Sequence, residues 1–174
     1  MHFAVVQGNI AKQSAHVLVN STSPDATMNC GVAAALQREA DGPLKTDVVR
    51  TSDVSCDEVV VTDAYNLSAR YVIHAVPFTS EGSVTEHSIS AATRAVLSRT
   101  DEMECRSLVL PVLGCGGGGY DLSDGTRHIC EAILAFDSTA LADVRLIAHT
   151  ADNFEAVRSA ALAAKQSESL LNKA

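Results

Sequence analysis

The feature of this 174-residue chain with most potential for chemistry is a cluster of glycines. Five of the ten glycines lie within residues 114–119, and Cys115 is the one other residue there. Residues without a Cβ atom let a ligand approach the backbone amides closely. Amides at the start of a helix favour an anion, and phosphate above all. The cluster follows an apolar segment and precedes a predicted helix, so we interpret it as a phosphate-binding loop rather than a flexible surface turn.

Two familiar phosphate-binding patterns fit this cluster less well. The letters GxGxxG, typical of dinucleotide-binding folds, occur within residues 114–119. The next predicted strand ends at Ala148-His149, without the acidic residue that would hold a ribose in such a fold. Tyr120-Asp121 stand where a Walker A loop needs Lys followed by Ser or Thr. The phosphate-binding interpretation depends on neither pattern.

The cysteines form neither a CxxC pair nor a zinc-finger spacing. They are Cys30, Cys56, Cys105, Cys115 and Cys130. An odd number without metal-binding spacing is typical of reduced thiols in a cytosolic protein. The sequence therefore predicts no metal site and no cofactor.

For four other side chains we favour a structural role over a catalytic or metal-binding one. His74 lies inside an apolar segment and is expected to be a core histidine rather than a base. Only a helix N-terminus would lower the pKa of Cys115, so a nucleophilic role is not favoured. His128 and Cys130 are two residues apart on a predicted helix and point to different faces, which predicts one core and one surface residue rather than a metal pair.

The elements that position these residues alternate between strands and helices. Apolar and β-branched runs predict strands at residues 3–7, 16–19, 59–61, 71–76, 107–113 and 144–148. Helices are predicted at 31–40, from a capping box at Ser83–Glu86 to about 99, at 122–136, and from a cap at Asp152 to about 170. This order favours a three-layer α/β/α domain spanning residues 1–174, with helices on both faces of the sheet. Ligands bind such sheets beyond the carboxyl ends of strands, where residues 20–32 and the glycine cluster converge.

Charge and composition exclude several other classes. The formal net charge is −8, which argues against extended nucleic acid or an anionic membrane surface as a partner. No apolar run approaches the roughly 20 residues of a membrane span. The first residues lack the basic region and the small-residue cleavage site of a secretory signal, so we expect a cytoplasmic protein. The oligomeric state is left open.

Five segments, in the same order along most of the chain, resemble the macro domain family, whose members bind ADP-ribose. Ala64–Val76 is similar to the family segment GYxLPAKYVIHTV, and Gly8-Asn9-Ile10 to its GDI. Val17–Asn20 resembles the start of its IVNAAN, and Pro111–Gly116 its PxISTG. The spacing from Asn20 to Gly31-Val32 equals that from the family asparagine to its first glycine-rich loop. The resemblance implies a three-layer α/β/α macro-domain-like fold with a mixed central sheet.

The resemblance also implies a role for each matching position. Gly8, Asn9 and Ile10 correspond to the adenine end of the site, and His149 to an aromatic residue that stacks on adenine. Asn20 corresponds to a position beside the terminal ribose. The first loop would cover the terminal ribose and diphosphate, and the glycine loop would wrap the diphosphate. The candidate ligand-binding residues are Gly8, Asn9, Ile10, Asn20, Cys30, Gly31, Val32, Gly114, Cys115, Gly116, Gly117, Gly118, Gly119, Tyr120 and His149.

Plain structural roles stay open for two of these positions. Asn9 also fits a turn residue between the first two strands, and His149 a strand-end histidine in contact with solvent. Two departures from the family indicate a wider pocket at the terminal ribose. Residues 28–31 replace a run of glycines, and Gly118 stands where an aromatic residue usually packs.

The hydrolytic residues of the family are not present at the matching positions. Its hydrolases use the last asparagine of IVNAAN and an aspartate ten residues later, and those positions here are Ser23 and Ala33. An alanine can neither orient a water molecule nor accept a proton. Some similar hydrolases instead pair a lysine with an aspartate just beyond the second loop, which makes Asp121 a catalytic candidate with Lys12 or Lys45. The alternative is that Asp121 interacts with the helix dipole.

Three functions follow, in order of preference. The first is binding of ADP-ribose, or of an ADP-ribosylated protein or metabolite, with little or no hydrolase activity. The second is hydrolysis of ADP-ribosyl esters, such as O-acetyl-ADP-ribose or mono-ADP-ribosylated proteins, with a non-standard residue set. The third is a nucleotide- or RNA-end-binding module.

Overall fold

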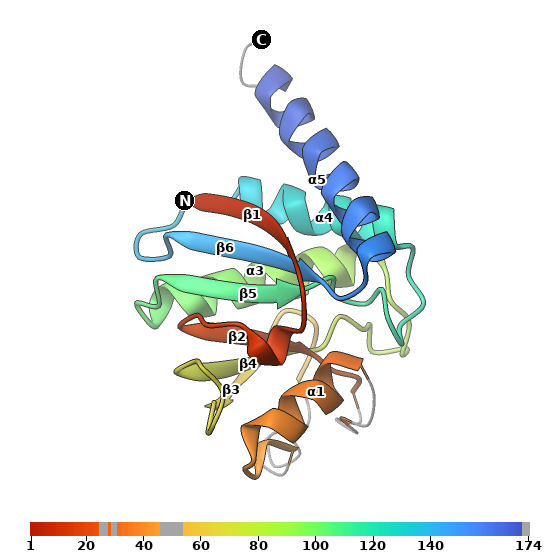
Figure 1. Ribbon diagram of the computed structural model, residues 1–174. Helices are drawn as coiled ribbons and strands as arrows, with labels where there is room; N and C mark the ends of the chain where they lie inside the picture. Colours follow the sequence, from red (N-terminus) through yellow and green to blue (C-terminus); the bar gives the residue numbers. More distant parts are fainter. Residues whose placement is uncertain (25–27, 29–30, 46–53, 172–174) are drawn as a thin grey trace.

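Six strands form one sheet in the computed structural model, which describes residues 1–24, 28, 31–45 and 54–171 (Figure 1). The strands are β1 (His2–Gln7), β2 (Val17–Ser21), β3 (Val59–Asp63), β4 (Tyr71–Ala75), β5 (Ser107–Pro111) and β6 (Asp143–Ala148). Each lies at a segment where the sequence predicts a strand. Their β-branched and apolar residues suit a sheet covered on both faces.

The sheet is mixed, as predicted. Its strand order is β1-β6-β5-β2-β4-β3. Strand β3 runs antiparallel to β4, and every other neighbouring pair is parallel. The carboxyl ends of β1, β6, β5, β2 and β4 therefore meet at one edge, on the right in Figure 1. The loops that leave this edge include both predicted ligand-binding segments.

Helices cover both faces and complete three layers. The short helix η1 (Ile10–Lys12) and α1 (Gly31–Ala40) pack on one face, and α3 (Glu86–Glu102), α4 (Leu122–Leu134) and α5 (Ala151–Leu171) pack on the other. Strand β2 shows the alternation that makes this possible. Val17 and Val19 enter the core under α3, α4 and α5, whereas Leu18 enters the core under α1. The later turns of α5 project beyond the sheet (Figure 1).

The start of α3 differs from the sequence prediction. The capping box consists of Thr85 and Ser88, not Ser83 and Glu86: the Thr85 hydroxyl accepts from the Ser88 amide, and the Ser88 hydroxyl accepts from the Thr85 amide. Thr85 has the extended backbone, φ −131° and ψ 163°, that an N-cap requires. Ser83 instead lies 2.9 Å from the Thr79 hydroxyl in the preceding turn. Two overlapping hydroxyl-containing patterns made the boundary ambiguous in sequence.

The start of α5 is corrected in the same way. Asp152 lies inside the first turn. The Thr150 hydroxyl, two residues earlier, accepts from the Asn153 amide at 3.2 Å and caps the helix. None of the helices in the described ranges is both long and apolar enough to span a membrane.

Candidate functional site

The two residues predicted for the adenine end lie together although 141 positions separate them in the chain. The Gly8 amide donates to the Ala148 carbonyl at 2.9 Å, which extends the β1–β6 pairing past the strand end. The His149 Nδ1 atom lies 3.4 Å from the Gly8 carbonyl oxygen. His149 is exposed at the carboxyl edge of the sheet.

Asn9 and Ile10 have structural roles at the same place. The Asn9 Oδ1 atom accepts from the Ala11 amide at 3.0 Å and caps η1. The turn role given as an alternative for Asn9 is therefore present, and an adenine contact would use the rest of its amide group. Ile10 is 4% exposed and packs in the core under α1.

The glycines at the two ends of the glycine loop are required by the fold. Gly114 and Gly119 have φ angles of +76° and +70°, which favour glycine. A Cβ atom on Gly114 would lie 2.6 Å from Val84 Cγ1. A Cβ atom on Gly118 would lie 2.5 Å from the Gly114 carbonyl oxygen. Side chains at these positions would displace the loop itself.

At the two positions in the middle of the loop, neither packing nor backbone conformation requires a glycine. A Cβ atom on Gly116 or Gly117 would meet no atom within 4 Å, and neither residue has a positive φ. Both residues are exposed. The open space before their backbone is the geometry that close approach of a ligand requires.

Cys115 anchors the loop to α4. Its Sγ atom lies 3.5 Å from the Leu113 carbonyl oxygen and 3.4 Å from that of Asp121, so the thiol can donate to either. A Cβ atom on Gly125 of α4 would overlap this sulfur, so that glycine makes room for the thiol. Burial, and secondarily the Asp121 charge, raise the pKa of Cys115 to about 12. The thiol therefore stays protonated at neutral pH, which is consistent with a structural role and not with a nucleophile.

Tyr120 closes the loop. Its amide donates to the Gly114 carbonyl at 3.2 Å. Its hydroxyl lies 3.4 Å from Nε2 of His128, and the two rings meet edge to face with centroids 6.2 Å apart. Burial raises the pKa of Tyr120, with Asp124 as a further cause. His128 and Cys130 are both buried, so the prediction of one core and one surface residue was wrong: His128 packs beneath Tyr120.

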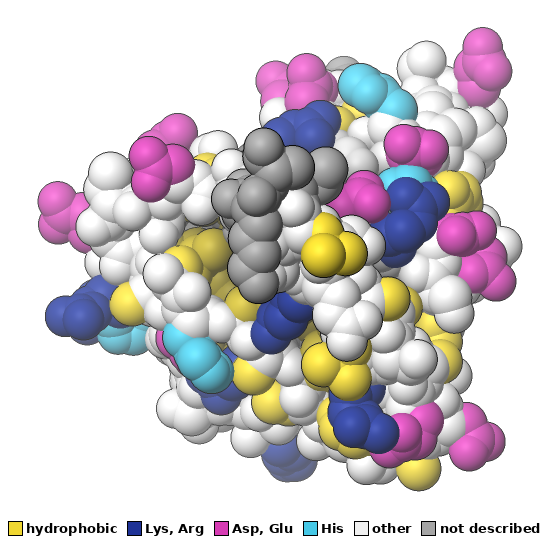
Figure 2. Space-filling model, turned by 90° about the horizontal axis from the view of Figure 1, so that it is seen from above, with side chains coloured by type: hydrophobic (Ala, Val, Ile, Leu, Met, Phe, Trp, Pro, Cys, Tyr) yellow, Lys and Arg dark blue, Asp and Glu magenta, His cyan; other side chains and the backbone are white. Residues whose placement is uncertain are grey.

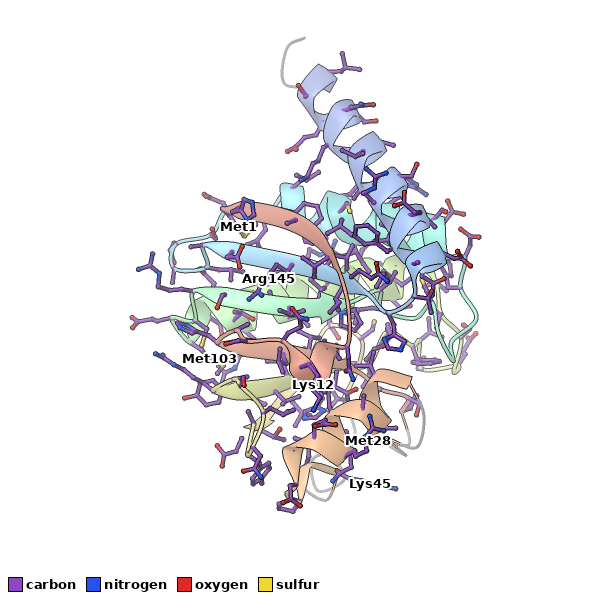
Figure 3. The ribbon with its side chains drawn as sticks, viewed as in Figure 1. Met1, Lys12, Met28, Lys45, Met103 and Arg145 are labelled. Atoms are coloured by element: carbon purple, nitrogen blue, oxygen red, sulfur yellow. The ribbon has the colours of Figure 1, made fainter. Side chains whose placement is uncertain are left out.

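Asp121 caps α4. Its Oδ1 atom accepts from the Asp124 amide at 2.9 Å, which is the helix-terminal role that the sequence offered as the alternative to catalysis. The Lys12 ammonium forms an ion pair with Glu39. Lys12 is the last residue of η1, and Lys45 follows α1 (Figure 3), whereas α4 packs on the opposite face of the sheet. The lysine–aspartate pair considered from sequence is therefore split between the two faces.

The first loop is described in part, and Cys30 lies outside the described residues. Gly31 opens α1 with φ +57°, and Val32 packs against the core under α1. Met28 is 4% exposed in the same core. Ala33, at the position of the family aspartate, is also buried there, with 6% of its surface exposed. The segment thus contributes apolar packing where related hydrolases have an acid.

Asn20 lies at the carboxyl edge within a buried polar chain. Its Nδ2 atom lies 3.0 Å from His74 Nδ1, and His74 Nε2 lies 2.9 Å from the Thr62 hydroxyl. The expectation that His74 is a core histidine with its ring nitrogens hydrogen-bonded is confirmed. The contact of Thr62 with His74 was not predicted, because a threonine in a strand next to an aspartate gives no local signal of it.

A large groove lies away from these residues. It has a volume of about 1080 Å³ between β3 and α3, and its lining includes Val60, Arg94 and Arg99 but none of the predicted ligand-binding residues. In the parts of the chain that the structure describes, no three His, Cys, Asp or Glu side chains gather as a metal site would need. The carboxyl edge remains the place where the predicted residues meet.

Comparison with known proteins confirms the resemblance to the macro domain family. The macro domain family model matches residues 19–129. Over 160 residues the chain is 33% identical to an uncharacterised protein of Mycobacterium tuberculosis, which covers 92% of this chain and 44% of that protein. The chain therefore spans less than half the length of the mycobacterial relatives that it matches.

Solved structures share the fold. The macrodomain of Oceanobacillus iheyensis with ADP superposes with a TM-score of 0.82 at 19% identity, over 98% of this chain and 92% of that one. The Trypanosoma brucei macrodomain in complex with ADP-ribose gives a TM-score of 0.80 at 24% identity, over 91% and 68%. Together with the family match, this likeness confirms the predicted three-layer α/β/α arrangement around a mixed sheet. The chain belongs to the macro domain family.

Proposed function

We propose that this chain binds ADP-ribose, free or attached to a protein or metabolite, with the diphosphate against the backbone amides of residues 114–119. The observation that carries the proposal is the open backbone at Gly116 and Gly117, which neither sterics nor φ angles explain. A ligand that needs close approach to amides supplies the missing reason. Two macrodomain structures with the same fold contain ADP or ADP-ribose, which supports this choice of ligand.

The charge distribution agrees with a backbone-based anion site. Figure 2 shows acidic and basic side chains interspersed over the face seen from above. The loop leads into the N-terminus of α4, where the helix dipole favours an anion. An acidic protein can therefore bind a diphosphate without a basic surface, whereas extended RNA would require one.

Little or no hydrolysis is part of the proposal. Ala33 is a buried apolar residue where related hydrolases have an aspartate, and Asp121 uses one carboxylate oxygen to cap α4. An alanine cannot act as a general base for an attacking water, and the capping bond holds the Asp121 carboxylate at the start of α4. We also propose a reducing, cytoplasmic setting, because free thiols are typical of one. The free thiols are those of Cys56, Cys105, Cys115 and Cys130.

Calorimetry with ADP-ribose tests the proposal. We expect heat of binding for the wild type, and loss of binding by about 100-fold or more in Gly117→Glu, because the new carboxylate occupies the diphosphate position. The control Ser123→Glu adds the same charge at an exposed position in the first turn of α4 and should weaken binding only about 3-fold. Absence of heat from the wild type at millimolar ADP-ribose would refute the proposal.

A further inference from the structure

A histidine and two arginines lie at the amino-terminal edge of the sheet, opposite the edge where the predicted ligand-binding residues meet. His16 directly precedes β2, and the strands on either side of β2, which are β4 and β5, begin beside it (Figure 1). Arg70 directly precedes β4, and Arg106 directly precedes β5. Neighbouring strands are about 4.8 Å apart, so the backbones of the two arginines are roughly 10 Å apart, one on each side of the histidine.

All but one of the polar atoms of His16 have hydrogen-bond partners within the fold. Its amide donates to the Ser107 hydroxyl at 2.9 Å, and its carbonyl oxygen accepts from the amides of Arg70 and Tyr71 at 3.0 and 3.2 Å. Its Nδ1 atom lies 2.9 Å from the Arg106 amide, which can only donate, so Nδ1 accepts. The proton of the neutral ring is then on Nε2, and this half-buried ring has no partner for Nε2–H in the described part of the chain.

The two flanking arginines add positive charge that no acid neutralises. None of the ion pairs among the described residues includes Arg70 or Arg106, and both side chains are exposed. Burial, and next the charges of Arg70 and Arg106, lower the pKa of His16. The ring is therefore mainly neutral at pH 7. An anion placed between the arginines would offset their repulsion and favour the charged form of the ring.

Acidic residues belong to the elements around this cluster. They are Asp63 at the end of β3, Asp101 and Glu102 near the end of α3, Glu104 before β5, and Asp143 at the start of β6. Two of them have partners: Asp101 accepts from the amides of residues 139–141, and Asp143 pairs with Arg145 and His2. The negative charge of these acids repels a long polyanion such as RNA, so the cluster is suited to a small anion.

We propose that His16, Arg70 and Arg106 bind a dianionic phosphate group, either as inorganic phosphate or as the phosphate monoester of a small molecule. Such a group has three terminal oxygens, which match the Nε2–H donor of His16 and one guanidinium from each side. A guanidinium suits phosphate because it donates two parallel hydrogen bonds. The site is at the opposite edge of the sheet from the glycine loop, so it does not depend on the proposed function.

A titration followed through the ring signals of the six histidines tests the proposal. With inorganic phosphate at pH 7 and constant ionic strength, we expect saturable shifts of the His16 ring and a dissociation constant on the order of 1 mM. Glycerol phosphate distinguishes the two sources, because tighter binding than inorganic phosphate assigns the site to an ester and weaker binding assigns it to the free ion. Dimethyl phosphate has a single negative charge and should bind at least about 10-fold more weakly than either.

Three single substitutions of the same charge separate the site from the net charge of the protein. Arg70→Gln and Arg106→Gln each remove one of the proposed guanidinium contacts and should weaken phosphate binding at His16 about 5-fold or more. The control Arg94→Gln removes the same charge from an exposed arginine of α3 and should weaken it less than about 2-fold. Equal losses in all three variants would overturn the proposal, because only net charge would then matter.

Sulfate separates the titration of the site from that of the ligand, because sulfate stays a dianion over the range in which histidine titrates. The protonated His16 ring carries a third positive charge beside the arginines. We therefore expect saturating sulfate to raise the pKa of His16 measured by NMR, and sulfate to bind more tightly as the pH falls. A His16 ring whose signals and pKa do not respond to phosphate or sulfate would overturn the proposal, as would equal binding of dimethyl phosphate.

Discussion

The middle and the ends of the glycine loop contain the same residue type for different reasons. At Gly114 and Gly118 a Cβ atom would collide with Val84 or with the loop's own backbone. At Gly116 and Gly117 a Cβ atom would meet open space. The comparison separates glycines that shape the loop from glycines that leave it accessible. Within a glycine-rich stretch, only the glycines that the fold does not require therefore indicate a ligand site.

The largest effect expected from this comparison is on stability. Gly118→Ala should lower the free energy of unfolding by about 2 kcal/mol, because its Cβ would lie 2.5 Å from the Gly114 carbonyl oxygen. Gly117→Ala should leave stability unchanged within about 0.5 kcal/mol. Urea denaturation of both variants measures the difference. Equal stabilities would show that the ends of the loop are as permissive as its middle.

The contact between Cys115 and Gly125 predicts a smaller effect that a second change reverses. Gly125→Ala should destabilise the protein by about 1 kcal/mol, because the new methyl group overlaps the Cys115 sulfur. The double variant Cys115→Ala with Gly125→Ala should regain most of this loss, since the sulfur is gone. A double-mutant cycle by denaturation measures the coupling. Additive losses would mean that the thiol does not anchor the loop to α4.

Stability should also fall in alkaline solution because of buried thiols. Burial raises the pKa values of Cys115 and Cys130 to about 12 in the folded state. The unfolded chain releases these protons near pH 8.5, so the stabilisation is fully present below that pH and is lost as the pH rises toward 12. Melting curves from pH 7 to 10 should decline less steeply for the variant with both residues changed to Ala. Parallel curves would contradict the pKa assignment.

The smallest expected effect is at Asp121. Asparagine caps helices about as well as aspartate, so Asp121→Asn should keep stability within about 0.5 kcal/mol. Loss of one negative charge beside the loop should tighten ADP-ribose binding about 2-fold at low salt. Calorimetry at two salt concentrations checks this shift. Measurable turnover by the wild type that disappears in Asp121→Asn would instead establish Asp121 as catalytic and overturn the binding-only proposal.

Local patterns in the sequence predicted the elements and the edge where the loops converge. Alternating apolar runs located the six strands, and the helix at 31–40 was predicted at its observed bounds, Gly31–Ala40. Contacts between distant positions were not visible in the same way. The approach of Val84 to Gly114 and of Thr62 to His74 depends on how segments pack, and no spacing rule connects them.

The capping residues show a second kind of limit. Thr85 and Thr150 cap their helices, although Ser83 and Asp152 fit the same local rules. Where several neighbouring side chains can accept from a backbone amide, the sequence alone does not determine where the helix starts. The conformation of the preceding turn determines which residue caps it. The burial of His128 was also not predictable from local sequence, because it follows from packing against Tyr120 rather than from helical spacing.

The central claim is that the open middle of the glycine loop receives the diphosphate of ADP-ribose. Labelling with ¹⁵N-glycine gives one amide signal for each of the ten glycines, which a titration with ADP-ribose can follow one by one. The account predicts that the Gly116 and Gly117 amides show the largest saturable shifts, while the remote Gly42 amide stays unchanged. Saturable binding that leaves Gly116 and Gly117 unshifted, or no binding at all, would contradict it.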